Sequence, residues 1–262
     1  MNNHIGIVGI GVMGSNIALN FSDNDTKVSV YNKSQEKINQ LISADSSKNI
    51  SGFTDLEEFV KSIAKPRKIL ILVPSGEATN SVVESLFNFI EKKDTLIDGG
   101  NAYYLDSIDL GKRCSEQGIE FIGMGISGGE TGARTGPALM LGYGKEIPED
   151  LISMISRIAA KADGQECIGL YEGFGTGHFI KMLHNGIEYA EMQILAEAYS
   201  ILRAAGFDNA AASEFFNNLR KEKQSSYLIE ITSSILNTQK DGAYLIDNIK
   251  PVANNKGKGK LP

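Results

Sequence analysis

Four polar side chains recur at helical spacing in the second half of the chain. Lys181, His184, Asn185 and Glu188 stand at positions i, i+3, i+4 and i+7 of a segment that contains few helix breakers. In a helix this spacing places all four side chains on one face. One amine, one imidazole, one amide and one carboxylate form a set suited to proton transfer and to orienting a substrate. A solvated helix face is the alternative interpretation, and spacing alone leaves both open.

A glycine-rich loop lies near the amino terminus. Gly9, Gly11 and Gly14 form a G-x-G-x-x-G pattern between an apolar stretch that predicts a strand and a stretch that predicts a helix. The first glycine permits a tight turn, the second lets a pyrophosphate approach the backbone, and the third lets the helix pack on the strand. The helix N-terminus then faces the phosphates. The pattern predicts dinucleotide binding by Gly9, Ile10, Gly11, Val12, Met13 and Gly14.

The end of the second predicted strand favours NADP over NAD. NAD sites place Asp or Glu there, about 20 residues after the glycines, to hold the ribose 2′-hydroxyl. This chain has Asn32, Lys33 and Ser34 at that point, with no acid. The charge of Lys33 suits a 2′-phosphate. Ser34 either donates a hydrogen bond to that phosphate or only caps the next helix.

Two further glycine-containing segments follow predicted strands. Residues 127–132 read S-G-G-E-T-G, and residues 98–101 read D-G-G-N. The first is expected to be a loop that offers backbone N–H groups to a carboxylate or phosphate, with a flexible crossover as the alternative. The second is a strand-end turn near the expected nicotinamide position.

Strand and helix patterns alternate through the first part of the chain. β-Branched runs at 5–10, 27–31, 68–73, 95–98 and 120–123 alternate with helical stretches, and strand-like pieces follow at 138–142 and 166–170. This order predicts an α/β, Rossmann-type, doubly wound and mostly parallel sheet. After Gly177 a long helix at 178–205 is expected, with a buried seam formed by Ile180, Leu183, Ile187, Ala190 and Ile194. We therefore expect a nucleotide domain at 1–176 and an incomplete all-helical domain at 177–262.

Composition excludes several classes of protein. The 262 residues carry a net charge of −6, which gives no basic footprint for nucleic acid. No apolar run reaches the roughly 18 residues of a membrane helix, and no secretory signal precedes the first strand. The two cysteines and three histidines form no metal-binding motif. We expect a cytoplasmic protein without a metal, a nucleic-acid partner or a membrane partner.

The motifs taken together resemble the 6-phosphogluconate dehydrogenase family, which is decarboxylating and NADP-linked. The resemblance runs from residue 4 to about residue 260. It rests on G-V-M-G-S-N at 11–16, L-I-D-G-G-N at 96–101, S-G-G-E at 127–130, G-A-R at 132–134, G-H-F-I-K-M-L-H-N-G-I-E-Y at 177–189 and Y-L-I-E-I-T at 227–232. The motif at 177–189 is the most specific of these.

The resemblance implies roles for individual residues. Lys181 would be the general base for the substrate's 3-hydroxyl and later protonate the keto oxygen, and Glu188 would protonate the carbon that loses carbon dioxide. No metal is needed, because a β-keto acid already has an electron sink. The implied substrate contacts are Asn101, Ser127, Gly128, Gly129, His184, Asn185, Tyr189 and Lys256. The implied cofactor contacts are the glycine loop, Asn32, Lys33, Ser34, Val73, Pro74, Ser75 and Asn101.

The chain also departs from the family pattern. Lys33 replaces the usual arginine, so a bidentate grip on the 2′-phosphate becomes a point charge. Family chains continue through a long helical region that builds a homodimer and lends an arginine and a histidine to the partner's site. On this basis we expect little turnover from these 262 residues alone. The resemblance further implies a place in the pentose phosphate pathway and in gluconate utilization.

Two alternatives stay open at this point. One is a related β-hydroxyacid dehydrogenase that acts on another small acid. Tyr189 and Lys256 argue against it, because both resemble phosphate-binding positions of the family. The other is an NADP-binding module without turnover, which the missing C-terminal region would favour.

Overall fold

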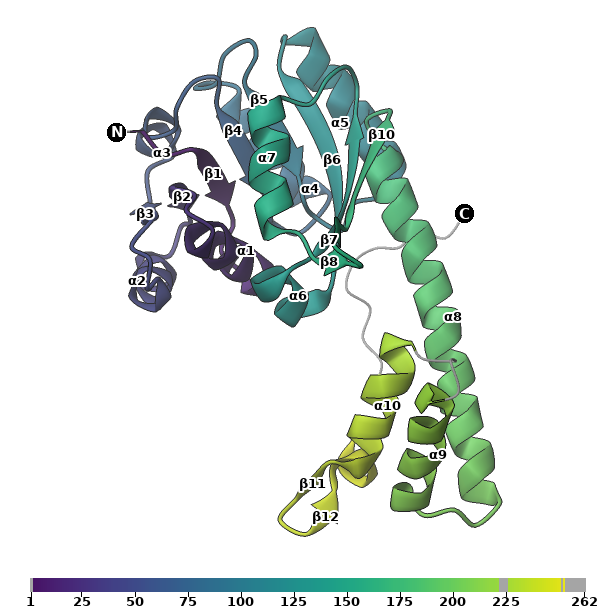
Figure 1. Cartoon of the computed structure of the whole chain (residues 1–262). Coiled ribbons are helices and arrows are strands. Elements are labelled where there is room, and N and C mark those ends of the chain that lie inside the picture. Colours follow the sequence, from purple (N-terminus) through teal and green to yellow (C-terminus); the bar gives the residue numbers. More distant parts are fainter. Residues whose placement is uncertain (1, 222–225, 251, 253–262) are drawn as a thin grey trace. The chain divides into compact units, whose positions relative to one another are not determined.

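An eight-stranded sheet forms the centre of the first of two structural units (Figure 1). The computed structural model describes residues 2–221, 226–250 and 252. The first unit extends to Met182, and the second begins at Leu183. The strands of the large sheet are β1 (Ile5–Val8), β2 (Val28–Tyr31), β3 (Ile50–Phe53), β4 (Lys68–Ile71), β5 (Thr95–Asp98), β6 (Glu120–Ser127), β7 (Ala138–Tyr143) and β10 (Ile168–Glu172).

The strand order confirms the predicted Rossmann-type fold. Across the sheet the order is β10-β7-β6-β5-β4-β1-β2-β3. The chain adds β2 and β3 on one side of β1 and then adds β4 on the other side, so the strand order reverses between β1 and β4. Such a reversal opens a crevice at the carboxyl ends of the strands, where nucleotides bind. All neighbours are parallel except β6 and β7, which are antiparallel with Ser127 opposite Ala138. Residues 128–137 are too short a link for a parallel crossover, which accounts for this departure.

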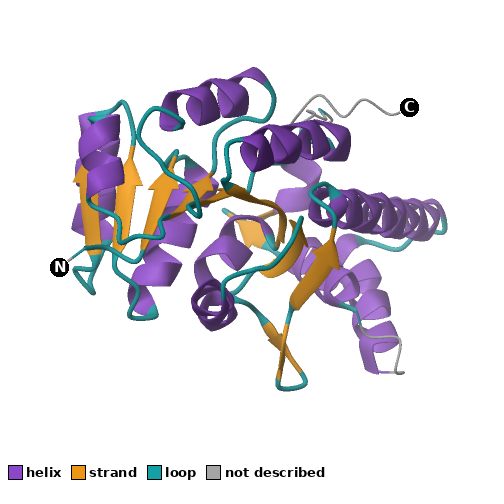
Figure 2. Cartoon of the chain, turned by 90° about the horizontal axis from the view of Figure 1, so that it is seen from above, coloured by secondary structure: helices purple, strands orange, loops and turns teal. Residues whose placement is uncertain are grey.

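Helices cover both faces of the sheet (Figure 2). Alternate strand residues point to opposite faces, so Ile7 joins one core and Val8 the other. One core includes residues of α1 (Val12–Asp23), α2 (Gln35–Ala44), α6 (Gly129–Thr135) and α7 (Glu149–Ile158). The other includes residues of α3 (Leu56–Lys61), α4 (Glu77–Leu86) and α5 (Tyr104–Glu116). Because both faces are buried, the strands are continuous apolar runs, as the sequence indicated.

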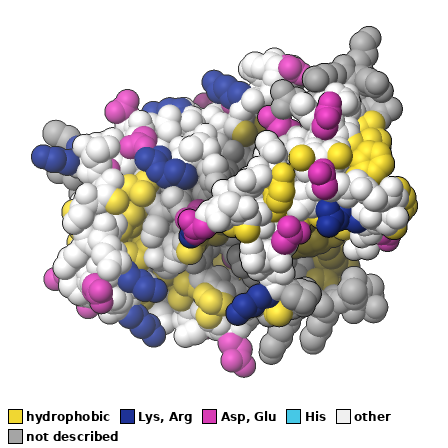
Figure 3. Space-filling view, turned by 90° about the horizontal axis from the view of Figure 1, so that it is seen from below, with side chains coloured by type: hydrophobic (Ala, Val, Ile, Leu, Met, Phe, Trp, Pro, Cys, Tyr) yellow, Lys and Arg dark blue, Asp and Glu magenta, His cyan; other side chains and the backbone are white. Residues whose placement is uncertain are grey.

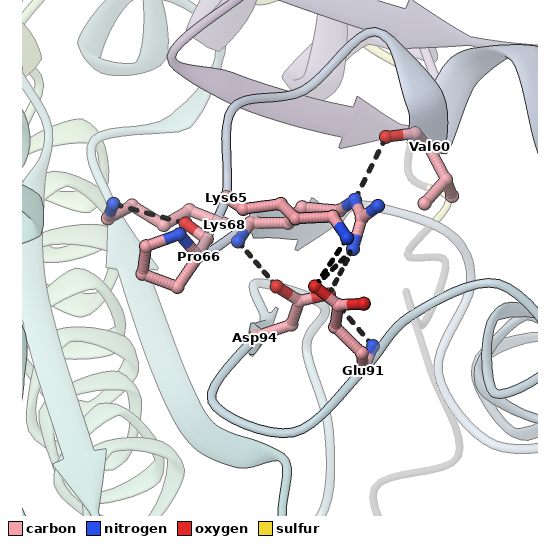
Figure 4. A network of polar contacts seen from close by, with 7 residues as sticks. Val60, Lys65, Pro66, Lys68, Glu91 and Asp94 are labelled. Carbon is pink, nitrogen blue, oxygen red and sulfur yellow. Dashed lines mark hydrogen bonds and ion pairs between the residues drawn. The ribbon is translucent and has the colours of Figure 1, made fainter.

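A buried ion pair joins the amino ends of β4 and β5. The backbone N–H of Arg67 donates to Asp94 Oδ1 at 2.6 Å, and Arg67 Nη1 lies 2.8 Å from Asp94 Oδ2. Arg67 Nε also donates to the Val60 carbonyl at 3.1 Å, and the Glu91 N–H donates to Asp94 Oδ2 at 2.9 Å (Figure 4). The Asp94 side chain is 1% exposed. This network lies at the edge of the sheet opposite to the carboxyl ends of the strands.

Two expectations about local structure were wrong. The segment 127–132 is not a loop, because β6 extends to Ser127 and α6 begins at Gly129. Gly128 and Gly129 have φ values of 125° and 60°, so the two glycines turn the chain sharply and the helix starts directly afterwards. The edge strand β3 was also missed, because Ser51 and Gly52 interrupt its short apolar pattern. A small hairpin pairs β8 (Lys161–Ala162) with β9 (Gln165–Glu166).

The second unit is helical, as expected. α8 (Thr176–Ala204) continues from the first unit into the second, and Gly206 follows its end with φ 91°. α9 (Asn209–Lys221) packs against α10 (Tyr227–Asn237) around Phe216 and Leu236. The hairpin of β11 (Gln239–Lys240) and β12 (Ala243–Tyr244) and the 3₁₀ turn η1 (Leu245–Asn248) follow. Among residues 251–262, only Val252 belongs to the described part of the chain.

The predicted seam of α8 is not buried. Leu183, Ile187 and Ile194 are 47%, 64% and 64% exposed. The spacing correctly predicted a helix with an apolar stripe, but the described part of the chain supplies no element that covers this stripe.

Candidate functional site

The glycine loop has the geometry of a nucleotide-binding turn. Gly9 follows β1 with φ 91°, and a Cβ there would lie 2.6 Å from the Leu72 carbonyl oxygen. A Cβ at Gly14 would overlap the Gly9 carbonyl oxygen, so only glycine allows α1 to start this close to β1. A Cβ at Gly11 would meet nothing within 4 Å. The backbone at Gly11 is therefore open to a ligand, and no side chain caps the N-terminus of α1.

The end of β2 presents a cation and no carboxylate. Lys33 is exposed immediately after β2. Asn32 Nδ2 donates to the Ser34 carbonyl at 3.4 Å, and Ser34 Oγ accepts the Lys37 N–H at 3.4 Å. Ser34 thus caps α2, as its alternative interpretation indicated, and its hydroxyl proton is a donor that this cap does not use. The arrangement fits an anionic group on the ribose better than a bare 2′-hydroxyl.

The turns after β4 and β5 are joined by a hydrogen bond. Ser75 Oγ donates to the Asn101 carbonyl oxygen at 2.9 Å. A Cβ at Gly100 would lie 3.3 Å from the Val73 carbonyl oxygen, so these two turns are in close contact. Pro74 lies between Val73 and Ser75 in the first of these turns. Its carbonyl oxygen accepts a hydrogen bond from the Thr79 hydroxyl at 3.3 Å. The structure therefore places Ser75, an implied cofactor contact, beside Asn101 in the turn that is expected near the nicotinamide.

Glycines let the start of α8 lie directly on β6 and β7. A Cβ at Gly177 would overlap the carbonyl oxygens of Gly123 and Met140. A Cβ at Gly125 would lie 2.5 Å from Lys181 Cβ and 2.9 Å from the Gly177 carbonyl oxygen. This backbone contact fixes Lys181 over β6. β6 ends at Ser127, and Gly128 and Gly129 follow it, so three of the implied substrate contacts lie at the end of the strand on which Lys181 packs.

The other three polar residues that were predicted to share a helix face with Lys181 belong to the second unit. His184 Nδ1 lies 3.7 Å from Glu188 Oε2 and 3.5 Å from Asn185 Oδ1. All three side chains are half-buried, whereas Tyr189 is 67% exposed. Lys181 lies in the same helix, α8, as these residues, so the predicted helical spacing of the four polar side chains at 181, 184, 185 and 188 is confirmed. Lys256 lies outside the described residues.

Family models match both parts of the chain. The model described as the NAD binding domain of 6-phosphogluconate dehydrogenase matches residues 4–171. The model described as the C-terminal domain of 6-phosphogluconate dehydrogenase matches residues 177–262. The chain belongs to the 6-phosphogluconate dehydrogenase family.

Individual relatives of this family agree with the assignment. The NADP(+)-dependent, decarboxylating 6-phosphogluconate dehydrogenase of Bacillus subtilis is 45% identical over 260 residues, which are 98% of this chain and 55% of the relative. The 6-phosphogluconate dehydrogenase structure from Plasmodium falciparum is 36% identical with a TM-score of 0.91, covering 98% of this chain and 56% of that chain. A 3-hydroxyisobutyrate dehydrogenase structure from Salmonella typhimurium, at 16% identity and TM-score 0.69, covers 88% and 76% and shares the fold. The chain spans about half the length of the curated relatives it matches.

Two buried titratable groups lie behind the Asn101 turn of this family member. Asp98 ends β5, His178 lies in the first turn of α8, and each is 2% exposed. Burial raises the pKa of Asp98 above its ordinary value, and the nearby His178 only partly opposes this shift. Burial lowers the pKa of His178, with Asp98 opposing. For both groups, burial shifts the pKa in the direction that disfavours the charged form.

Two classes of feature are not found in the described part of the chain. No cluster of three or more His, Cys, Asp and Glu side chains there could hold a metal ion. Within residues 2–221, 226–250 and 252, no helix has the length and apolar character to cross a membrane. Basic and acidic side chains are interspersed on the face in Figure 3, and neither sign forms a continuous patch on that face.

Residues that pack the start of α8 against the sheet were not predicted from the sequence. Gly123 and Gly142 approach this start and His178 lies in the first turn of α8, but none of the three was expected to have a role. A signal was present, since Gly123 ends the predicted strand at 120–123 and Gly125 follows two residues later, so both point to one face if the strand continues. Glycines on one face of a strand indicate the close approach of another backbone.

Proposed function

We propose that this chain forms the NADP site and part of the substrate site of a 6-phosphogluconate dehydrogenase. The reaction would be the oxidative decarboxylation of 6-phosphogluconate to ribulose 5-phosphate and carbon dioxide, with reduction of NADP to NADPH. One observation carries the proposal: the glycine contact at Gly125 holds Lys181 on β6, within the same unit as the open backbone at Gly11. The family of the chain supports the same reaction.

The residues present fit the cofactor. The open backbone at Gly11 and the N-terminus of α1 would receive the pyrophosphate, and Lys33 would face the 2′-phosphate. Gly9, Ile10, Val12, Met13 and Gly14 complete that loop, and Asn32, Ser34, Val73, Pro74, Ser75 and Asn101 would line the rest of the cofactor. When bound, NADP supplies the hydride acceptor.

The chemistry of the substrate would be carried by two side chains of α8. Lys181 takes the proton of the 3-hydroxyl group as that carbon is oxidised to a ketone. The resulting β-keto acid loses carbon dioxide, and Lys181 returns its proton to the keto oxygen to give an enediol. Glu188 protonates the carbon that carried the carboxylate. Substrate binding would use Asn101, Ser127, Gly128, Gly129, His184, Asn185, Tyr189 and Lys256.

The cellular setting belongs to the same proposal. We propose a domain division at 1–176 and 177–262, a homodimer, a cytoplasmic location, and a place in the pentose phosphate pathway and gluconate utilization. The exposed apolar stripe of α8 supports assembly with further helices or a second subunit. The free Cys114 and Cys167 support a reducing compartment.

An NADP-binding module without turnover is the second candidate. The observation that favours it is the exposure of Tyr189, an implied substrate contact that is 67% exposed, whereas the cofactor loop is held by the buried sheet. Both candidates predict cofactor binding, but only the first predicts NADPH formation from 6-phosphogluconate.

Cofactor titration tests the part common to both candidates. We expect NADP to bind more tightly than NAD. Lys33→Ala should weaken NADP binding about tenfold, in the range of a lost charged hydrogen bond, without affecting NAD. Lys37→Ala removes an exposed lysine from the same region and is the matched control. Equal affinity for the two cofactors in the unchanged chain, or a preference for NAD, would contradict the proposal.

NADPH absorbance separates the two candidates. The chain is mixed with NADP and 6-phosphogluconate, with the Bacillus subtilis relative as the active reference. A chimaera that continues this chain with the remaining sequence of that relative is tested in parallel. NADPH formation by the chimaera supports the dehydrogenase. A chimaera that folds and binds NADP but forms no NADPH would favour the module.

A further inference from the structure

The His178 side chain has a hydrogen-bond partner at each ring nitrogen. Its Nε2 lies 3.1 Å from the Gly100 carbonyl oxygen, and its Nδ1 lies 2.7 Å from Ser107 Oγ. Ser107 belongs to α5 and is 1% exposed. One buried imidazole therefore connects the start of α8, the turn after β5 and a helix on the same side of the sheet.

The partners determine which nitrogen carries the proton. A carbonyl oxygen only accepts, so His178 Nε2–H donates to Gly100 and Nδ1 is left as an acceptor. The Ser107 hydroxyl fits that acceptor, because its second possible partner, the Tyr103 carbonyl, is more distant at 3.4 Å. The result is a neutral imidazole, in agreement with the lowered pKa of His178 in its buried surroundings.

The Gly100 peptide is held from both sides. Its N–H donates to Asp98 Oδ1 at 2.9 Å, and its carbonyl accepts from His178. The next residue, Asn101, is in turn held by Ser75 through its carbonyl at 2.9 Å. On the other side, His178 precedes Lys181 by three residues on α8.

We propose that His178 is a positioning residue that holds the Asn101 turn against the start of α8. It acts through the Gly100 carbonyl and keeps Asn101 and Lys181, which come from different elements, at a fixed separation. The inference rests on the proposed function, because it needs the Asn101 turn to face the nicotinamide end of the cofactor. It assigns His178 no contact with substrate or cofactor.

A purely structural role makes a different prediction. If His178 only filled the core, its replacement would destabilise the whole first unit. The affinity of that unit for each of its ligands would then fall by a similar factor. A positioning role at the Asn101 turn instead affects only ligands that reach this turn. Adenosine 2′,5′-bisphosphate carries the 2′-phosphate and adenosine of NADP but has no nicotinamide, so it probes the distant end alone.

The test measures the affinity of both ligands for four variants of the chain. His178→Leu removes both hydrogen bonds, and we expect it to weaken NADP binding about three- to tenfold while adenosine 2′,5′-bisphosphate changes less than twofold. His178→Gln keeps an N–H that can reach the Gly100 carbonyl and should recover most of the NADP affinity. Ser107→Ala should give a smaller loss with the same ligand pattern. Ser22→Ala is the matched control, because Ser22 is a fully buried serine that bonds Asp45 Oδ1 at 2.5 Å at the far end of α1.

The outcomes separate the inference from the proposed function. Parallel weakening of both ligands, unchanged NADP affinity in His178→Leu, or no recovery by His178→Gln would overturn the positioning role. If His178→Leu does not fold, the ligand pattern of Ser107→Ala against Ser22→Ala decides. If the unchanged chain binds neither ligand, the proposed cofactor site itself is wrong and the inference falls with it.

Discussion

A methyl group inserted between β6 and α8 should stop turnover without removing the cofactor. The substitution is Gly125→Ala. The added Cβ would lie 2.5 Å from Lys181 Cβ, about 0.9 Å short of the 3.4 Å at which ordinary contact begins. It would also lie 2.9 Å from the Gly177 carbonyl oxygen. Because Gly177 contributes backbone and Lys181 contributes its Cβ, rotation of a side chain cannot relieve the overlap, and α8 must move.

The size of that movement sets the expected effect. A displacement of about 1 Å at a reacting group lowers rates by about a hundredfold. Overpacking of this kind lowers the free energy of unfolding by about 1–3 kcal/mol. A Cβ at Gly125 would meet neither the glycine loop nor Lys33 among its nearest neighbours. The affinity for adenosine 2′,5′-bisphosphate should therefore stay within about twofold of that of the unchanged chain, which is a change in binding free energy of less than about 1.4 kcal/mol.

The assay compares kcat, ligand affinity and Tm in the chimaera with the Bacillus subtilis sequence. Gly52→Ala is the control, because Gly52 lies on the distant edge strand β3 and its added Cβ would overlap Ile38 Cγ2 of α2. We expect both variants to lower Tm, and only Gly125→Ala to lower kcat. If Gly125→Ala lowers Tm as much as the control but keeps kcat within threefold of the parent, the β6–α8 contact does not set the position of Lys181.

Three further predictions follow from single side chains. In the chimaera, Lys181→Met should abolish NADPH formation and leave NADP affinity unchanged; a near-normal rate would remove the lysine from the chemistry. Asp94→Asn should lower the free energy of unfolding by about 3–5 kcal/mol in urea, because it breaks a buried ion pair, whereas Glu84→Gln breaks an exposed pair and should change it by less than about 1 kcal/mol. Because burial lowers the pKa of His178, only the unfolded chain gains a proton there below about pH 6.5. Stability should therefore fall as the pH falls through that range, by at most about 1.4 kcal/mol per pH unit. The raised pKa of Asp98 acts in the opposite direction, so the contribution of His178 is measured as the difference in slope between the unchanged chain and His178→Gln; identical slopes would contradict it.

The parts of the fold that local sequence determines were predicted well. Gly9, Gly11 and Gly14 are close in sequence, and their conformations depend on the strand that directly precedes them and the helix that they begin. The apolar runs of the sheet strands were equally clear, because both faces of this sheet are buried. The long helix α8 was predicted from its spacing, since a period of 3–4 residues persists through it.

Contacts between distant segments could not be predicted from local sequence. The link from Ser75 to Asn101 joins turns 26 residues apart, and the contact of Gly125 with Lys181 depends on how a helix lies on a sheet. The prediction that the apolar stripe of α8 is buried was wrong for a related reason. Apolar spacing predicts which side of a helix is hydrophobic, but burial depends on a packing partner, and Ile187 remains 64% exposed.

The two halves of the proposed site differ in what holds them. The cofactor half uses backbone groups at the ends of β1, β4 and β5, which the buried sheet keeps in place regardless of most side chains. The substrate half would use side chains of α8, and this helix packs on the sheet at its start, where Gly177 and His178 are buried. Because α8 is one continuous helix, a shift of its start displaces the side chains that follow. Substitutions at the anchor should therefore separate cofactor binding from turnover, whereas substitutions in the glycine loop should remove both.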